Sequence, residues 1–146
     1  MIKDLRFKEF FESVTKRFSS EELFFGLTTI ITIVIDYNSI VPAICTLLLL
    51  AFYYLFFGWL LFRNERKTNF LFSIISGIVY SICLVCMVII IIKDFYSVFF
   101  YCIQFVILII YFMYLRKAKK IELYKANHYI RIAIILFLNI FISIFK

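Results

Sequence analysis

The feature that most constrains this chain is residues 40–62, an uninterrupted apolar run without a charged side chain. An α-helix rises about 1.5 Å per residue, so this run makes a helix of roughly 34 Å, enough to cross a hydrocarbon core of about 30 Å. The run ends at Arg63, and Glu65, Arg66 and Lys67 follow directly. A full-length apolar run that ends in a basic cluster predicts a membrane-spanning helix with a defined orientation.

Composition supports a membrane protein and argues against a water-soluble domain. Hydrophobic residues fill 65% of the 146 positions, whereas soluble domains average about 45–50%. The mean hydropathy is +1.03. The net charge of +7 is gathered in short clusters between apolar runs. In a membrane protein such clusters first set the topology and only then offer contacts to anionic partners.

Four further apolar runs divide the chain. Residues 70–92, 98–115 and 129–145 are long enough to span a membrane, whereas residues 23–35 form a short run. Counted from Ser20, the short run makes a helix of about 24 Å, which spans only where the bilayer thins locally. The sequence therefore predicts an all-α, polytopic membrane helical bundle with four to five transmembrane helices. Five spans are favoured, and the alternative for the short run is a re-entrant or surface helix.

Residues 1–22 form a segment of their own ahead of the transmembrane bundle, residues 23–146. At helical spacing its apolar side chains fall within one arc of about 100°, which predicts an amphipathic helix in the membrane interface. A helix packed on a partner protein is the alternative. Ser19 and Glu22 have the spacing of a capping box, which predicts that a new helix starts there. The apolar arc consists of Phe7, Phe10, Phe11, Val14 and Phe18.

Lys and Arg counts alternate between the two sides of the predicted bundle. The N-terminal segment has five, residues 36–39 none, residues 63–69 three, residues 93–97 one and residues 116–128 five. By the positive-inside rule the N-terminus and the other rich segments are cytoplasmic, in a plasma (inner) membrane. Arg131, just inside the last run, is expected to snorkel back to the cytoplasmic side.

Aromatic residues at the run ends fit the same topology. Trp59, Tyr111, Tyr114 and Tyr129 fall near the predicted cytoplasmic ends of their runs. Amphipathic rings prefer the headgroup region, so these residues predict an aromatic belt at that interface.

No catalytic constellation is visible, so the sequence predicts no enzyme, no cofactor and no metal site. The only histidine, His128, is expected at the membrane boundary beside basic residues, and Glu122 is six residues away. No Asp or Glu lies inside an apolar run, so paired-carboxylate chemistry lacks its main part. Cys83 and Cys86 have a redox or metal spacing, but burial in an apolar helix disfavours the thiolate that either chemistry needs.

Two sets of residues inside the runs predict helix faces. The first set is small and spaced by four, which opens a groove where another helix approaches closely, in the same protomer or in another. The second set is polar and should face protein or a water-filled path, because an unsatisfied amide is costly in hydrocarbon. The first set is Ser73, Gly77 and Ser81, and the second is Gln104, Asn139 and Ser143.

Residues 116–128 interleave basic and aromatic side chains. Their simplest role is a topology signal that also contacts anionic lipid headgroups. A sharper alternative is a cytoplasmic site for a nucleotide or an oligonucleotide, in which Lys and Arg bind phosphate and Tyr stacks on a base. The candidate anion-binding residues are Arg116, Lys117, Lys119, Lys120, Tyr124 and Lys125.

The short run carries a polar stripe. Three threonines and an aspartate share an arc of about 100° on a helix, with a phenylalanine at the inner end as a hydrophobic constriction. An aspartate repeated by symmetry forms an anionic ring that attracts cations. Threonines that bond back to their own helix would instead make only a packing face. The predicted pore-lining residues are Phe25, Thr28, Thr29, Thr32 and Asp36.

These patterns favour a small integral membrane protein that forms a homo-oligomeric pore or channel-like effector for ion transport. An anionic cytoplasmic ligand would gate it, and the lipid bilayer would be its other partner. The alternatives are a non-catalytic partner or assembly subunit of a larger membrane complex, or a small carrier.

Overall fold

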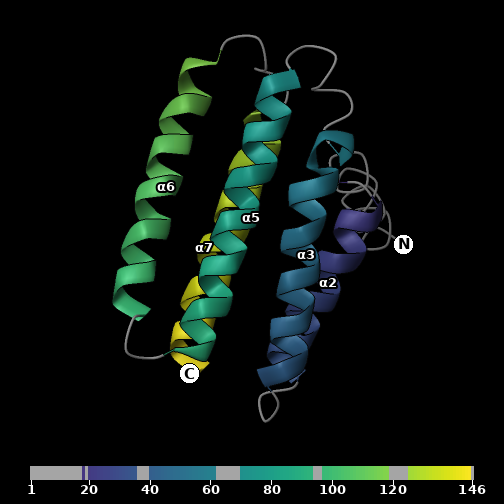
Figure 1. Cartoon of the computed structure of the whole chain (residues 1–146), viewed down its shortest axis with the longest axis vertical. Coiled ribbons are helices and arrows are strands. Elements are labelled where there is room, and N and C mark those ends of the chain that lie inside the picture. The colour runs from purple at the N-terminus through teal and green to yellow at the C-terminus, as the bar shows by residue number, and fades with distance from the viewer. Residues whose placement is uncertain are drawn as a thin grey trace, which may run out of the picture.

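Five helices make up the part of the chain that the computed structural model describes, which comprises residue 18 and residues 20–35, 40–61, 70–93, 97–118 and 125–145. They are α2 (Ser20–Ile35), α3 (Ile40–Leu61), α5 (Phe70–Ile92), α6 (Ser97–Lys117) and α7 (Lys125–Phe145) (Figure 1). The predicted all-α fold is confirmed, and each helix covers one of the five apolar runs. Apart from residues 18 and 20–22, the predicted amphipathic helix lies outside the described residues.

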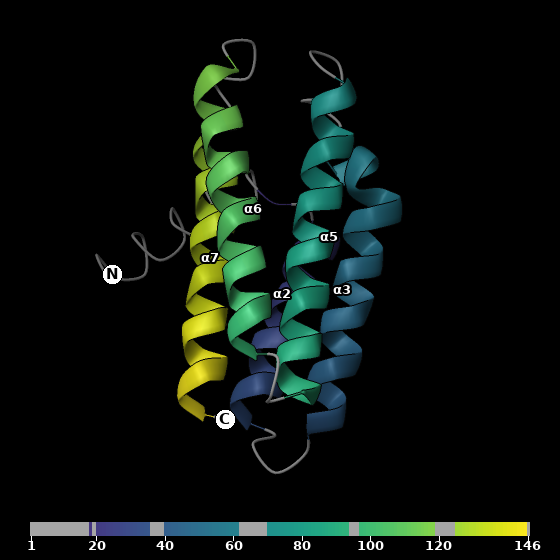
Figure 2. The same cartoon turned by 60° about the vertical axis from the view of Figure 1, so that its left-hand side comes forward.

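The helices lie side by side along one long axis, and the chain direction reverses from each to the next (Figures 1 and 2). α3 packs along α5 and α2 lies against α3, while α6 and α7 lie on the other side of α5. At one end of the bundle α3 connects to α5 and α6 connects to α7. We name this the basic end, because both connections are rich in Lys and Arg. In Figure 1 it is at the top.

Four of the helices, α3, α5, α6 and α7, are long and apolar enough to cross a membrane. They contain 22, 23, 21 and 21 residues, or about 32–35 Å at 1.5 Å per residue. α2 contains 16 residues, or about 24 Å, and starts below the basic ends of its neighbours (Figure 1). The chain is therefore an integral membrane protein with four candidate spans and one shorter helix packed on the same bundle.

The sequence accounts for several helix ends. α2 carries Glu21 and Glu22 in its first turn, and α6 carries Arg116 and Lys117 in its last turn. Both placements are favoured by the helix dipole, which is positive at the first turn and negative at the last. Pro42 lies in the first turn of α3, where its missing N–H costs nothing.

The core of the bundle follows α5, whose small residues let its neighbours approach closely. Large apolar side chains fill the space between α5 and the helices around it. Other Phe, Leu and Ile side chains point outward from α3, α6 and α7, which suits a protein whose solvent is lipid. The largest apolar side chains that are almost fully buried are Leu47, Phe72, Tyr80, Leu84, Met87, Ile90 and Leu115.

Candidate functional site

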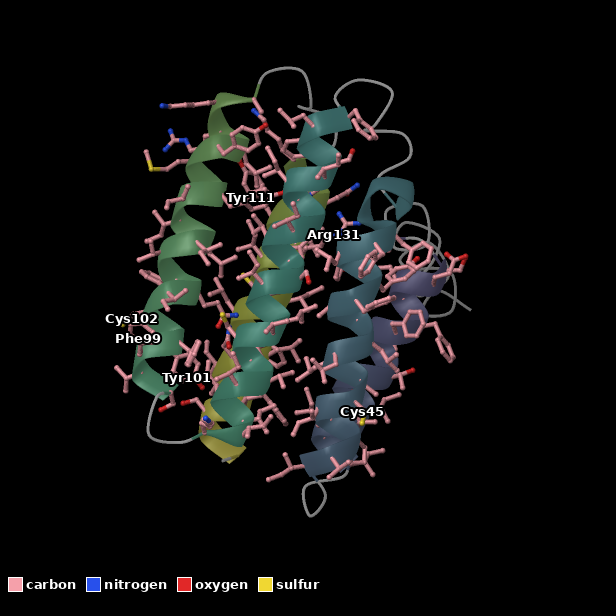
Figure 3. The ribbon with its side chains drawn as sticks, in the orientation of Figure 1. Cys45, Phe99, Tyr101, Cys102, Tyr111 and Arg131 are labelled. Atoms are coloured by element: carbon pink, nitrogen blue, oxygen red, sulfur yellow. The ribbon has the colours of Figure 1, made fainter. Side chains whose placement is uncertain are left out.

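Polar side chains from all five helices meet in the half of the bundle nearer the basic end. All of them are buried, although each carries a charge or a hydrogen-bonding group. Figure 3 shows two of them, Tyr111 and Arg131, in this upper half. We name the set the polar network: Glu22 on α2, Tyr54 on α3, Ser76 and Tyr80 on α5, Tyr111 on α6, and His128 and Arg131 on α7.

The charged part of the polar network is an ion pair between α2 and α7. Arg131 Nε lies 2.6 Å from Glu22 Oε1 and Arg131 Nη2 lies 2.9 Å from Glu22 Oε2, a bidentate geometry. Tyr54 Oη donates a further hydrogen bond to Glu22 Oε1. The ring of Phe18 lies 4.8 Å from the guanidinium carbon of Arg131, within the range of a cation–π contact. Two charge-assisted hydrogen bonds therefore fix the first described helix to the last one.

The ion pair lies within the length of the candidate membrane spans of α3 and α7. Tyr54 precedes the end of α3 by seven residues, and Arg131 follows the start of α7 by six, which places both about 9–11 Å from those helix ends. α2 begins at this depth. Glu22 lies in its first turn, where the helix dipole favours a negative charge. Charged side chains at such a depth are tolerated when they pair with one another, as these two do.

The neutral part of the polar network surrounds His128, which is fully buried. His128 Nδ1 lies 2.7 Å from Tyr80 Oη and 3.1 Å from Tyr111 Oη. Tyr111 Oη donates to Ser76 Oγ at 2.7 Å, and Ser76 Oγ donates to the carbonyl of Phe72 at 2.8 Å. A chain of hydrogen bonds thus runs from the imidazole through α6 to the backbone of α5.

The donor order of this chain fixes the role of the Tyr111 hydroxyl. The single phenolic hydrogen of Tyr111 is used toward Ser76, so Tyr111 Oη can only accept from its other neighbours. Its contact with His128 Nδ1 is therefore a hydrogen bond only when this nitrogen carries a hydrogen, and either atom can be the donor in the short contact between Nδ1 and Tyr80 Oη.

The two parts of the polar network are in contact. The rings of Tyr54 and Tyr80 have centroids 5.4 Å apart, and the ring of Tyr80 stacks on the imidazole of His128 at 6.0 Å. His128 and Arg131 are three residues apart on α7, so they lie on the same helix face. A change at the imidazole therefore acts on the same helix and the same aromatic cluster that hold the ion pair.

Three sequence predictions are corrected by this arrangement. His128 was expected at the membrane boundary beside basic residues, and it is buried between two tyrosines of other helices. Arg131 was expected to snorkel toward the cytoplasm, and it binds Glu22 instead. Tyr111 was expected in an aromatic belt, and its side chain is 2% exposed within the bundle. The physical reason is common to all three: each polar group finds a buried partner on a neighbouring helix.

The predicted pore-lining residues of α2 are largely bonded within the protomer. Thr28 and Thr29 donate to the carbonyls of Phe24 and Phe25, and Thr29 is fully buried. Thr32 donates to the carbonyl of Thr29, and its hydroxyl lies 3.1 Å from that of Thr46 on α3. The ring of Phe25 packs on Tyr53 of α3 at 5.3 Å. Asp36 lies outside the described residues.

Three of the predicted anion-binding residues lie at the basic end. Arg116 and Lys117 are exposed at the end of α6, and Lys125 Nζ lies 3.4 Å from the carbonyl of Arg116. Lys119, Lys120 and Tyr124 lie outside the described residues. The small residues predicted for helix packing, Ser73, Gly77 and Ser81, are all buried within the single chain.

An apolar cavity of about 300 Å³ lies directly beneath the ion pair, between α2, α3, α5 and α7. Glu22, Tyr54 and Arg131 close its end nearer the basic end, and Phe18 lies beside them. Its wall is otherwise almost wholly apolar, apart from Thr29, and includes Leu27, Ile30, Leu50, Leu84, Ile134 and Leu138. The ion pair thus lies between this apolar space and the basic end.

Among the described residues no three His, Cys, Asp or Glu side chains are grouped so that they could hold a metal ion. The polar network itself offers charge pairing and hydrogen bonding. No protein-family model matches the chain, and searches of curated proteins and of solved structures find no similar chain.

Proposed function

We propose that this integral membrane protein is the subunit of a homo-oligomeric, ion-conducting pore, and that the Glu22–Arg131 pair holds α2 in its closed position. The observation that carries the proposal is the bidentate ion pair buried between α2 and α7. Ionisable side chains inside membrane-spanning bundles are rare, and they usually mark ion pathways, proton relays or gating elements.

Stability of the fold is a weak reason to bury this pair. Replacing both partners of a buried ion pair with apolar residues is often neutral or stabilising, whereas removing one partner costs about 3–5 kcal/mol. The pair is therefore better suited to select one position of α2 than to add net stability. Such a link has two states, closed when the charges meet and open when they separate.

The surroundings of α2 favour its role as the moving part. α2 is the shortest of the five described helices, and the cavity beneath the ion pair lies along it and gives it space to shift. An apolar passage of this kind blocks ions while it is dry and conducts once it widens and takes up water. Thr29 lines the cavity, so a shift of α2 would bring part of the predicted threonine stripe to a water-filled path.

An anionic ligand at the basic end would act on the ion pair through α7. Lys125 begins α7 and lies beside Arg116 at the end of α6, while Arg131 follows on the same rigid helix. A phosphate bound between these basic residues would pull on the first turn of α7. Two groups on one helix that both bias its position provide a physical basis for coupling.

The test is ion flux from liposomes that contain the purified protein. Wild type is compared with Glu22→Gln, which removes the charge of the pair, and with Glu21→Gln, which removes the adjacent exposed acid. Loss of a charge-assisted hydrogen bond is worth about 1.5–3 kcal/mol, so Glu22→Gln should raise potassium flux roughly tenfold or more. Glu21→Gln should leave the flux at the wild-type level.

Each outcome of the flux experiment decides for or against the proposal. Equal flux through both variants would remove the ion pair from gating. If wild type and both variants each elute as one folded species and none of them conducts ions, a pore is excluded. That outcome would favour the alternative of an assembly subunit in a larger membrane complex.

A further inference from the structure

A second cavity lies between α6 and α7, in the half of the bundle away from the basic end. Its volume is about 590 Å³, inside the range of about 300–1,000 Å³ that small-molecule sites occupy. Gln104 and Asn139 on its wall lie seven and six residues from the nearer ends of α6 and α7. Figure 3 shows Tyr101, another wall residue, on the lower part of α6, far below Tyr111. The cavity is therefore separate from the polar network.

Two amide oxygens on the wall of this cavity, Gln104 Oε1 and Asn139 Oδ1, lack a hydrogen-bond partner within the described part of the chain. Their side chains are 2% and 9% exposed. Gln104 Nε2 donates to the carbonyl of Cys83 at 3.3 Å, and a carbonyl only accepts, so this bond fixes the orientation of the amide. Both unmatched atoms are acceptors, and hydrocarbon offers them no donor.

We infer that this cavity binds a lipid-soluble alcohol or phenol, whose hydroxyl donates to Gln104 or Asn139 and whose apolar body fills the rest of the space. The wall around the two amides is mainly apolar, with Phe105, Leu108, Leu136 and Ile140 among its residues. None of the described residues that line it is charged, which disfavours a phospholipid headgroup. A buried water needs polar partners, and most of this apolar wall offers none, so water alone is a poor occupant of the cavity.

Position also favours a ligand that arrives from the bilayer. The cavity lies between two candidate membrane spans, and all the described residues that line it belong to these two helices. Exposed apolar side chains on the same helices, such as Ile109 and Phe137, face the lipid. A hydroxylated lipid can therefore enter sideways, keep its chain in hydrocarbon and place its head on the amides.

The test is photo-crosslinking in liposomes with a long-chain fatty alcohol that carries a diazirine, compared with its methyl ether. The ether has the same body but no hydrogen to donate. The alcohol should label the α6 and α7 peptides about five- to tenfold more than the ether, the factor expected for one hydrogen bond. The double variant Gln104→Leu/Asn139→Leu should lose this preference, whereas Ile109→Leu on the lipid-facing side of α6 should keep it.

Leucine is close in shape to both amides and leaves no acceptor unmatched, so the double variant should unfold at or above the wild-type temperature in detergent. The wild-type comparison of alcohol with ether decides the question even if that variant fails to fold. Equal labelling by the two probes would overturn the inference. Absence of labelling, together with a wild-type dimer that the double variant abolishes, would assign the amides to a second copy of this chain instead.

Discussion

Tyr111 and Tyr114 lie one turn apart on α6, and their hydroxyls have different surroundings. Tyr111 is buried, donates to Ser76 and lies 3.1 Å from His128 Nδ1. Tyr114 is half-buried and stacks on Phe72, and its hydroxyl makes no hydrogen bond within the described ranges. Removing the two hydroxyls separately therefore measures what the polar network contributes, since ring packing is retained in both cases.

We expect Tyr111→Phe to lower the free energy of unfolding by about 1–2 kcal/mol, because Ser76 loses its donor inside the bundle. Tyr114→Phe should stay within about 0.5 kcal/mol of wild type. Denaturant unfolding in detergent micelles, followed by circular dichroism, checks both values. Equal losses in the two variants would mean that the Tyr111 hydroxyl contributes nothing specific.

The sequence contains the members of the polar network but not their pairing. A lone arginine inside an apolar run requires a partner, and Glu22 at the start of the short run was available. Which helices become neighbours is not encoded in residue spacing, so a contact between residues 22 and 131 stays hidden. His128 was missed for a local reason: α7 begins at Lys125, one turn before the apolar run, which brings His128 into the helix.

At the scale of the helix, apolar length predicted the structure well. The runs at residues 40–62 and 70–92 match α3 and α5 to within one residue. A backbone surrounded by hydrocarbon must satisfy its polar groups internally, and a helix does this within one segment, so a long apolar run forms a helix. Helix ends in polar sequence are less constrained. The larger differences between the predicted runs and the observed helices are accordingly at the ends of α6 and α7.

α5 offers a direct test of close helix packing. Gly77 is buried on this helix, whereas its neighbour Ile78 is 40% exposed. We expect Gly77→Leu to force α5 away from the helices around it and to cost about 1–3 kcal/mol or more, the range for overpacked cores. Ile78→Leu should be close to neutral.

Both α5 variants can be compared by thermal unfolding and by size-exclusion chromatography in detergent. A Gly77→Leu protein with wild-type stability but a smaller oligomer would move the role of this residue to contacts between protomers. A Gly77→Leu protein identical to wild type in both measurements would show that its face tolerates a large side chain.

At the scale of the whole molecule, the bundle is asymmetric along its axis. The ion pair and His128 lie in the half nearer the basic end, whereas the cavity with the two unmatched amides lies in the other half. The side of the membrane that the basic end faces therefore decides where any regulator of the ion pair must act. The geometry of the helices is the same for both orientations, so only the charge distribution favours one.

We expect the basic end and the N-terminus to be cytoplasmic and Lys146 to be outside, because the connections rich in Lys and Arg alternate with the poor ones. The test is labelling with an impermeant thiol reagent in intact cells, using single cysteines in a background with the four native cysteines replaced by alanine. Tyr96→Cys should label in intact cells, and Lys120→Cys should label only after permeabilisation. The reverse pattern would place the ion pair near the outer surface and would exclude gating by a cytoplasmic anion. Labelling of both sites in intact cells would point to a population with two orientations, in which the charge difference between the two sides is too small to fix the topology.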